Sequence, residues 1–351
     1  MNENGTRAVI LMNLGSPDST SIPDVRKYLM EFLMDGRVID YPYILRSILV
    51  GGLIVPFRAA RSAKAYQSIW TKEGSPLIVN TKQLQAAVQP DVIESVHVAM
   101  RYGNPGMKET YKTIVEQHPA VNEVLIIPMY PHYAMSSYET AVEYAKQIHK
   151  KYKFPFTIKF IKPFFDQEDY IHALTESIRP FVQQPFDHFL FSYHGIPERH
   201  VLKSDPTKSH CLQSPDCCEA HSIAHSTCYR HQCLRTSSLV AEKLQLKPGK
   251  YSFAFQSRLG RSEWLKPYSV VRLEEMPAEG IKKLVMVCPA FVSDCLETLE
   301  EIAEEGRDVF LKAGGEQFTL IPCLNVHPLW VATLSRWIRE TAGADQSMIY
   351  S

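Results

Sequence analysis

Eight short runs of apolar residues recur along the chain, separated by segments with the apolar spacing of helices. The runs are RAVILMNLG (7–15), VHVAMRYG (96–103), EVLIIPMYPHY (123–133), FTIKFIKPF (156–164), DHFLFSYHG (187–195), KYSFAFQSRLG (250–260), KKLVMVCPAFVSD (282–294) and QFTLIPCLN (317–325). Most are almost continuously hydrophobic, as is typical of parallel strands covered on both faces. Strands that alternate with helices predict an α/β fold with right-handed crossovers.

A short repeat indicates how these strands are grouped. The first run ends in NLGSP (13–17) and the fifth in YHGIP (193–197), so a Gly-x-Pro turn follows a strand at the start of each half. Eight strands could also close a single barrel, but the repeat favours two halves. We therefore predict two similar Rossmann-like domains, each with a four-stranded parallel sheet flanked by helices. The expected boundaries are 1–170, 171–324 and a final segment, 325–351, whose helix packs on the first domain.

Polar residues at the carboxyl ends of the strands mark the expected binding region, because ligands bind there in open α/β sheets. They are Asn13, Arg101, Tyr102, Tyr130, His132, His194, Gln256, Ser257, Asp294 and Glu297. Neither a G-x-G-x-x-G sequence nor a Walker A loop occurs, so dinucleotides and nucleoside triphosphates lack their phosphate cradle.

Composition removes further classes of protein. The chain has 38 basic and 38 acidic residues and a formal net charge of zero, which argues against a nucleic-acid binder. The first residues, MNENGTRAVILMNLG, lack the features of a signal or transit peptide. We expect a cytoplasmic, bacterial protein.

The longest apolar stretch, YPYILRSILVGGLIVPFR (41–58), contains Arg46 and two prolines. It falls short of the roughly 20 apolar residues that span a bilayer, so no transmembrane segment is expected. It is either a buried core helix or a hydrophobic lip over an apolar ligand or at a membrane surface.

A histidine and a row of acids are the candidates for chemistry. His194 ends the fifth run, and Asp294, Glu297 and Glu301 share one face if a continuous helix follows the seventh run. Either group has a structural explanation, as a hydrogen-bonded strand-end histidine or as acids at a helix N-terminus. Together, an imidazole and carboxylates suit the removal of protons from nitrogen and the transfer of a divalent cation.

Seven motifs in collinear order resemble ferrochelatases, the terminal enzymes of haem synthesis. They are LMNLGSP, SIWTKEGSPL, MRYGNPG, YPHYAMSSYE, FSYHGIPERH, FQSRLGRSEWL and CPAFVSDCLETLEE. The resemblance implies the two-domain fold of the class II chelatases and the insertion of Fe(II) into protoporphyrin IX. It places His194, Glu297 and Glu301 at the catalytic positions, and His194 and Glu297 at the substrate iron.

The resemblance also implies a set of porphyrin contacts. The apolar stretch 41–58 is similar to the family's hydrophobic lip, which also offers peripheral contact with the inner face of the membrane. The implied contacts are Leu14, Arg58, Arg61, Tyr66, Ser75, Arg101, Tyr102, Tyr130, Ser257 and Trp264. Arginine suits a propionate because its guanidinium binds a carboxylate through two hydrogen bonds.

A cysteine-rich stretch lies outside these motifs. Residues 207–233 form an insertion relative to members that pass almost directly from GDP to QC, and they contain Cys211, Cys217, Cys218, Cys228 and Cys233. In a reducing compartment clustered cysteines favour metal binding over disulfides. No C-x2-C pair occurs, which weakens a zinc knuckle, whereas four thiolates suit a [2Fe–2S] cluster. Zinc and redox-active thiols remain as alternatives.

The insertion would be a different ligand set from that of the animal ferrochelatases. Met135 occupies the position of their loop cysteine, and the tail RETAGADQSMIYS contains no cysteine. Cys295 likewise stands where some members carry histidine.

Three other functions compete with insertion of iron into protoporphyrin IX. They are insertion into coproporphyrin III, cobalt or nickel insertion into a less oxidised tetrapyrrole, and haem or solute binding without catalysis. The long lip and the QSRLG…W motif argue against the small cobalt and nickel chelatases, and a binding protein has no need of the acidic row.

Overall fold

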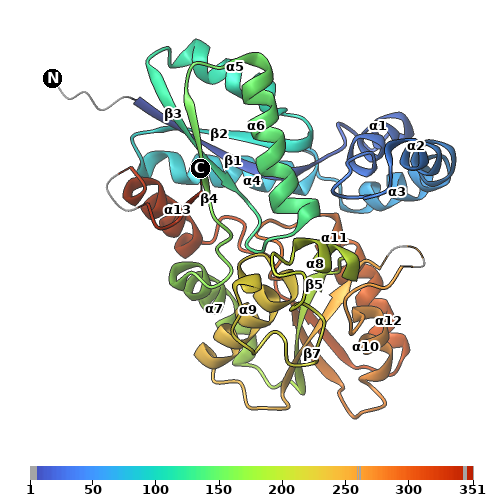
Figure 1. The fold of residues 1–351 in the computed structure, drawn as a ribbon. Helices are drawn as coiled ribbons and strands as arrows, with labels where there is room; N and C mark the ends of the chain where they lie inside the picture. The colour runs from blue at the N-terminus through green and yellow to red at the C-terminus, as the bar shows by residue number, and fades with distance from the viewer. Residues whose placement is uncertain (1–5, 259, 261, 343–345, 351) are drawn as a thin grey trace. The chain divides into compact units, whose positions relative to one another are not determined.

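The structure is a computed structural model that describes residues 6–258, 260, 262–342 and 346–350. The chain divides into two compact units (Figure 1). Unit 1 comprises Met1–Met129, Met135–Lys162 and Val331–Ser351, and unit 2 comprises Tyr130–Ala134 and Pro163–Trp330. The division falls at Pro163, so the predicted boundary after residue 170 lies inside helix α7 (Glu168–Val182).

Unit 1 is built on a five-stranded sheet in the order β2-β1-β3-β4-β9. Its strands are β1 (Thr6–Ser16), β2 (Ser95–Gly103), β3 (Val121–Pro128), β4 (Thr157–Ile161) and β9 (Ile349–Tyr350). Its helices are α1 (Ile22–Leu33), α2 (Tyr43–Ser47), η1 (Ile48–Ile54), α3 (Val55–Ile69), α4 (Pro76–Val88), η2 (Gln89–Asp91), α5 (Met107–Gln117), η3 (Met135–Glu139), α6 (Thr140–Tyr152) and most of α13 (Pro328–Glu340). The first four strands are parallel as predicted, and the short β9 adds an unpredicted antiparallel edge.

Unit 2 repeats the arrangement with a four-stranded parallel sheet in the order β6-β5-β7-β8. Its strands are β5 (His188–His194), β6 (Tyr251–Gln256), β7 (Lys283–Val287) and β8 (Gln317–Leu320). Its helices are α7, α8 (Glu198–Ser204), η4 (Ile223–Ser226), α9 (Tyr229–Lys243), α10 (Ser269–Glu275), α11 (Leu296–Leu299), η5 (Glu301–Gly306) and α12 (Arg307–Lys312). In both units the first strand lies between the second and the third, which confirms the two-fold internal repeat.

The glycines of the two repeated turns have a common physical reason. At Gly15 a Cβ atom would lie 1.7 Å from the carbonyl oxygen of Tyr102 in β2, and φ is +108°. At Gly195 it would lie 2.7 Å from the carbonyl oxygen of Gln256 in β6. Each first strand therefore ends where its backbone closely approaches the second strand, which only glycine permits.

The apolar stretch is not a buried core helix. Helices α2, η1 and α3 follow one another without a break as a helical segment, Tyr43–Ile69, which lies beside α1 and contacts it through η1 and α3 (Figure 1). Its exposed apolar side chains are Tyr43, Ile44, Leu45, Ile48, Leu53 and Phe57; we call them the apolar surface of the lip. The segment is 27 residues long, so by length and composition it meets the requirement for a membrane span, contrary to the expectation from 41–58 alone.

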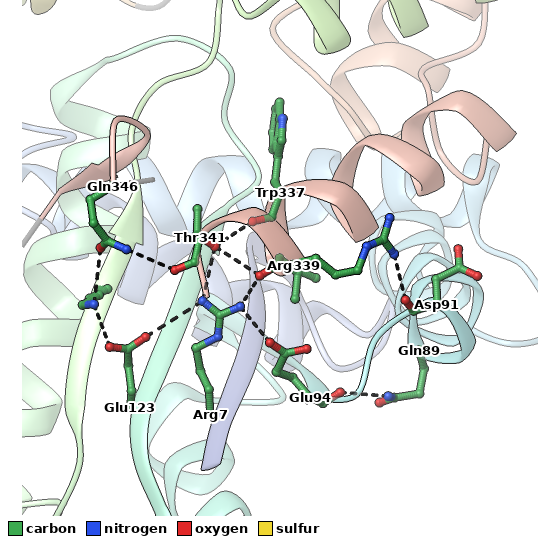
Figure 2. A network of polar contacts seen from close by, with 11 residues as sticks. Arg7, Gln89, Asp91, Glu94, Glu123, Trp337, Arg339, Thr341 and Gln346 are labelled. Atoms are coloured by element: carbon green, nitrogen blue, oxygen red, sulfur yellow. Dashed lines mark hydrogen bonds and ion pairs between the residues drawn. The ribbon is translucent and has the colours of Figure 1, made fainter. Parts of the chain in front are cut away.

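Figure 2 shows how the end of α13 is held in unit 1. The buried guanidinium of Arg7, at the start of β1, donates to Glu94 at 2.8 Å, to Thr341 at 3.3 Å and to the carbonyl of Ile338. Arg339 donates to the carbonyl of Asp91 at 2.8 Å. The last helix is thus bound to the segment that precedes β2 by charge-assisted hydrogen bonds, which are stronger than neutral ones.

Candidate active site

His194 is the last residue of β5, and its ring is held in one tautomer. Nδ1 lies 2.6 Å from the carbonyl oxygen of Gly195. Because a carbonyl oxygen can only accept, Nδ1 carries the proton of the neutral ring and Nε2 keeps its lone pair. Nε2 is therefore the nitrogen that can take a proton from a substrate.

Aromatic side chains surround this imidazole. The ring centroids of Trp264 and Phe291 lie 6.5 and 6.3 Å from that of His194. The backbone of Trp264 pairs with Pro197 in the turn after β5, which fixes the indole next to the histidine. The structure thus brings the predicted porphyrin contact Trp264 next to His194, together with Phe291, which was not predicted.

The acidic row differs from the single helix face that the spacing predicted. α11 is a single turn, Leu296–Leu299, and the chain continues as the π-helix η5 from Glu301. Asp294 precedes α11, and its carboxylate accepts from the side chains of Thr298 at 3.1 Å and Asn325 at 2.6 Å. The placement of Asp294 in the row was therefore wrong, because this carboxylate joins the loop after β7 to the loop after β8.

Glu297 and Glu301 are held by residues at the end of β6. The buried side chain of Gln256 donates to the backbone carbonyl of Glu297 at 3.0 Å, and Ser257 Oγ donates to Glu301 Oε2 at 2.7 Å. Ser257 has φ +66°, a left-handed conformation that serine rarely adopts. This strained turn at the strand end directs the hydroxyl to Glu301.

Burial raises the pKa of Glu301, and the neighbouring negative charge of Glu297 raises it further. The hydrogen bond from Ser257 and the attraction of His194 act in the opposite direction without cancelling the effect of burial. Glu301 thus interacts electrostatically with both other predicted catalytic residues. The site combines an imidazole that accepts a proton, a carboxyl group that tends to hold one, and a second carboxylate.

Replacing Glu301 by glutamine is expected to change how stability depends on pH. Because the folded-state pKa lies above the ordinary value of 4.5, the wild type loses stability as pH rises from that value through the raised pKa. The variant has no such group, so its free energy of unfolding relative to wild type should increase across this window. Urea unfolding between about pH 4 and pH 8 measures the difference.

Glu304→Gln is the matched control for this comparison, because Glu304 lies exposed in the same π-helix. It reports the effect of a Glu-to-Gln change as such, without a buried carboxyl group or a contact with Ser257. A constant difference for Glu301→Gln would contradict the raised pKa.

The predicted porphyrin contacts of unit 1 fall into two groups. Arg58 and Arg61 are exposed on α3, whereas Tyr66 is buried against Tyr28 and Trp70, and Ser75 is buried at the start of α4. Leu14 is half-buried in β1. Arg58 and Arg61 therefore present their guanidinium groups at the surface of α3, whereas Tyr66 and Ser75 are covered.

Arg101 and Tyr102 belong to a closed network. Both side chains donate to the carboxylate of Asp35, and the Arg101 guanidinium also donates to Thr140 at 2.8 Å and lies over the Tyr102 ring at 4.2 Å. Tyr102 is fully buried. The structure therefore does not support porphyrin contact by these two residues. Tyr130 is also buried, in a segment that belongs to unit 2.

The five clustered cysteines are all buried free thiols. The Cys228 thiol neighbours Cys211 and Cys218, and the Cys217 thiol neighbours Cys218, since each influences the pKa of its neighbour. Arg230 Nη1 lies 3.1 Å from the sulfur of Cys218 and 3.8 Å from that of Cys217. Burial raises the pKa of Cys211 to about 11, so the metal-free thiol is protonated.

Cys233 differs from the other four. It lies one turn after Tyr229 inside α9 and is fully buried, and this burial raises the pKa of its thiol well above the usual value. Within the residues that the structure describes, no three His, Cys, Asp or Glu side chains are already arranged to hold a metal ion.

Comparison with known proteins shows the family that the chain is similar to. The sequence model of the ferrochelatase family matches residues 6–342. A ferrochelatase of Ectopseudomonas mendocina (strain ymp) is 49% identical over 329 residues, which cover 93% of this chain and 96% of the relative. A ferrochelatase of Opitutus terrae is 48% identical over 338 residues, covering 95% and 97%.

Solved structures support the fold alone, because their sequence identity is low. SirB from Bacillus subtilis with Fe3+ has a TM-score of 0.54 at 13% identity, covering 97% of both chains. The cobalt complex of the sirohydrochlorin chelatase SirB from B. subtilis subspecies spizizenii has a TM-score of 0.53 at 11% identity, covering 99% of this chain and all of that one. With its family match over nearly the whole length and relatives at almost half identity, the chain belongs to the ferrochelatase family.

Proposed function

We propose that the chain inserts Fe(II) into protoporphyrin IX, giving protohaem and releasing the two pyrrole protons. The observation that carries this function is the grouping of His194, Glu297 and Glu301 around the end of β6. His194 is the register partner of Gln256, which donates to the carbonyl of Glu297, and the adjacent Ser257 donates to Glu301. Proton removal and cation delivery are the two tasks of metal insertion, and the site contains groups for both.

The chemistry follows from the macrocycle. A flat porphyrin keeps its four nitrogens in plane, so an incoming cation cannot easily displace the N–H protons. A site that binds the puckered ring exposes the nitrogen lone pairs and favours the transition state over the ground state. His194 Nε2 accepts a pyrrole proton, and the carboxylates of Glu297 and Glu301 pass on protons and the cation.

The apolar surface of the lip supports protoporphyrin IX over coproporphyrin III. Protoporphyrin carries two vinyl groups where coproporphyrin carries two further propionates. Tyr43, Ile44 and Phe57 expose apolar surface, and Arg46, within the same stretch, donates to the carbonyls of Ile39 and Tyr41. Steady-state rates with Fe(II) and each porphyrin should give the larger kcat/KM with protoporphyrin IX, and a reversed ratio would assign the chain to coproporphyrin III.

A second part of the proposal is a structural [2Fe–2S] cluster in the insertion. Cys211, Cys217, Cys218 and Cys228 supply four buried thiols that neighbour one another, and the cation of Arg230 lies where it would stabilise thiolates. This donor set fits the four-thiolate requirement of the cluster. Cys233 lies inside α9, where its thiol neighbours the Tyr229 side chain, and is left out of the set.

When bound, such a cluster contributes folding energy to the loop, because no preformed site exists in the unfolded chain. Asp205 also helps to order the insertion. Its carboxylate accepts hydrogen bonds from the backbone N–H groups of His210 and Cys211, both at 2.9 Å. The side chains of His210 and His231 donate to the carbonyls of Cys217 and Cys218 at 2.7 Å.

Anaerobically purified protein is expected to be reddish, with about two irons and two acid-labile sulfides per chain. Cys228→Ser should lose the colour, whereas Cys233→Ser, the matched buried cysteine outside the set, should keep it. About one zinc per chain without labile sulfide would decide for zinc. Colourless, metal-free and fully active protein would contradict both metals.

We also propose a cytoplasmic location with peripheral membrane contact, supported by the apolar surface of the lip. Arg58, Arg61 and Lys64 follow this surface on α3 and are exposed, as suits the interface with anionic lipids. Purified protein should float with anionic vesicles, and carbonate at high pH should release it. Protein that detergent alone removes would instead span the membrane.

A further inference from the structure

We propose that Tyr229 is a positioning residue for His194 and that it connects the cysteine-rich insertion to the active site. The inference rests on the proposed catalytic role of His194. Tyr229 is the first residue of α9 and directly follows Cys228. Its hydroxyl donates to the backbone carbonyl of His194 at 2.8 Å.

The hydrogen bond fixes the peptide group between His194 and Gly195. The carbonyl of this group accepts from Tyr229, and its N–H donates to the carbonyl of Gln256 at 2.8 Å. Both ends of the peptide plane are therefore held, one by a side chain and the other by the neighbouring strand. The next carbonyl, that of Gly195, is the one to which His194 Nδ1 donates.

This geometry decides which nitrogen of His194 is free. If the peptide plane turns, the Gly195 carbonyl moves away from Nδ1, and the ring can take the tautomer that carries its proton on Nε2. That tautomer cannot accept a pyrrole proton at Nε2. Tyr229 thus acts on the reaction through the orientation of the imidazole and does not need to touch the porphyrin.

Tyr229 remains a donor throughout the working pH range. Its side chain is 5% exposed, and its ring packs against His132 with centroids 6.0 Å apart. Burial raises the pKa of the Tyr229 hydroxyl well above its usual value. The phenol therefore stays protonated, and the hydrogen bond from Tyr229 to the His194 carbonyl is not lost through titration of the phenol.

The other end of the link is the insertion. Cys228 is the N-cap of α9, and its carbonyl accepts from the backbone N–H of Gln232 at 3.1 Å. The buried side chain of Gln232 donates to the carbonyls of His225 and Ser226 at 3.1 and 2.9 Å and accepts from the N–H of Tyr133 at 2.6 Å. The first turn of α9 and the end of the insertion are therefore ordered together, and Tyr229 lies in that turn.

Tyr229→Phe tests the positioning role, with Tyr193→Phe as its matched control. Tyr193 is also fully buried, adjoins His194 in sequence, and forms its hydroxyl hydrogen bond with Ser237 of α9 at 2.7 Å. Tyr193→Phe loses the hydrogen bond between Tyr193 and Ser237, and Tyr229→Phe loses the one from Tyr229 to the His194 carbonyl. Only the second change leaves the His194 carbonyl without this donor. We expect Tyr229→Phe to lower kcat by about tenfold with unchanged porphyrin affinity, and Tyr193→Phe to keep kcat.

The tautomer supplies a readout that loss of stability would not change. In protein labelled with 15N-histidine, the His194 signals can be assigned by their absence in His194→Ala. Tyr229→Phe should shift them towards the Nε2–H tautomer, and Tyr193→Phe should not. Unchanged signals in Tyr229→Phe would overturn the positioning role. The tautomer is measured without turnover, so this result does not depend on whether the wild type makes haem. Failure of the positioning role can therefore be distinguished from failure of the proposed function.

A double-mutant cycle tests the connection to the insertion. Cys228→Ser, or Cys211→Ser if the first variant does not fold, should shift the His194 tautomer in the wild-type background. In the Tyr229→Phe background the same change should add little, because the link is already broken. Equal shifts in both backgrounds would show that the insertion does not act through Tyr229.

Discussion

His194→Ala is expected to abolish metal insertion while porphyrin still binds. The variant lacks the only imidazole at the end of β5, whose Nε2 lone pair is kept free by the hydrogen bond between Nδ1 and Gly195. A positioned general base contributes about 10²–10⁴-fold, so kcat should fall by at least about 10². Porphyrin affinity, followed by fluorescence quenching, should change little, because removal of the imidazole leaves the ring wall of Trp264 in place.

His188→Ala is the matched control for His194. His188 begins the same strand, and its Nε2 lies 2.8 Å from the hydroxyl of Ser252, so its loss should affect stability and not turnover. Near wild-type turnover in His194→Ala would refute the catalytic role.

Glu297→Gln is expected to lower turnover far more than porphyrin affinity. Glutamine keeps the size of the side chain and the backbone hydrogen bond from Gln256, but it cannot carry a charge or a proton. A path for cations and protons needs that charge, so we expect kcat to fall by about 10². Steady-state kinetics with Fe(II), together with a fluorescence titration of porphyrin, separate the two effects.

Two neighbouring glutamates calibrate this result. Glu301→Gln should lower kcat less, because the raised pKa of Glu301 already favours its uncharged form and its carboxyl group is hydrogen-bonded to Ser257. Glu304→Gln should leave kcat unchanged, because Glu304 is exposed. Equal, small losses in Glu297→Gln and Glu301→Gln would reduce the acidic row to part of a solvated helix.

The sequence predicted the two parallel sheets because their strands are buried on both faces. Ala8, Ile10 and Met12 in β1 alternate with Val9 and Leu11, and all five are fully buried. A nearly continuous apolar run is the direct record of that burial. β9 could not be found in this way, because a two-residue edge strand leaves no periodic pattern.

The site was predictable in its residue types and less so in its local geometry. His194 and the turn glycines could be predicted from their positions at strand ends, but no sequence pattern predicts the π-helix that begins at Glu301. Asp294 and Arg101 were misread for a shared reason. A polar residue after a strand either faces a ligand or hydrogen-bonds to neighbouring protein groups. The contact of Asp294 with Asn325 and that of Arg101 with Asp35 show the second case.

Tyr229 was not predicted to contribute, and Gln256 was predicted only as a polar residue at a strand end, because both act through other residues. Gln256 holds the backbone of Glu297, and Tyr229 holds the backbone of His194. Neither contact leaves a motif of its own in the sequence, since both partners offer only a peptide carbonyl.

The most direct test of the account is the proton balance of the reaction. Anaerobic protein is mixed with Fe(II) and protoporphyrin IX in weak buffer, and the haem absorbance and the released protons are recorded together. The account predicts catalytic haem formation with two protons released for each haem, and no proton release with His194→Ala. Porphyrin or haem binding without iron-dependent proton release would contradict it.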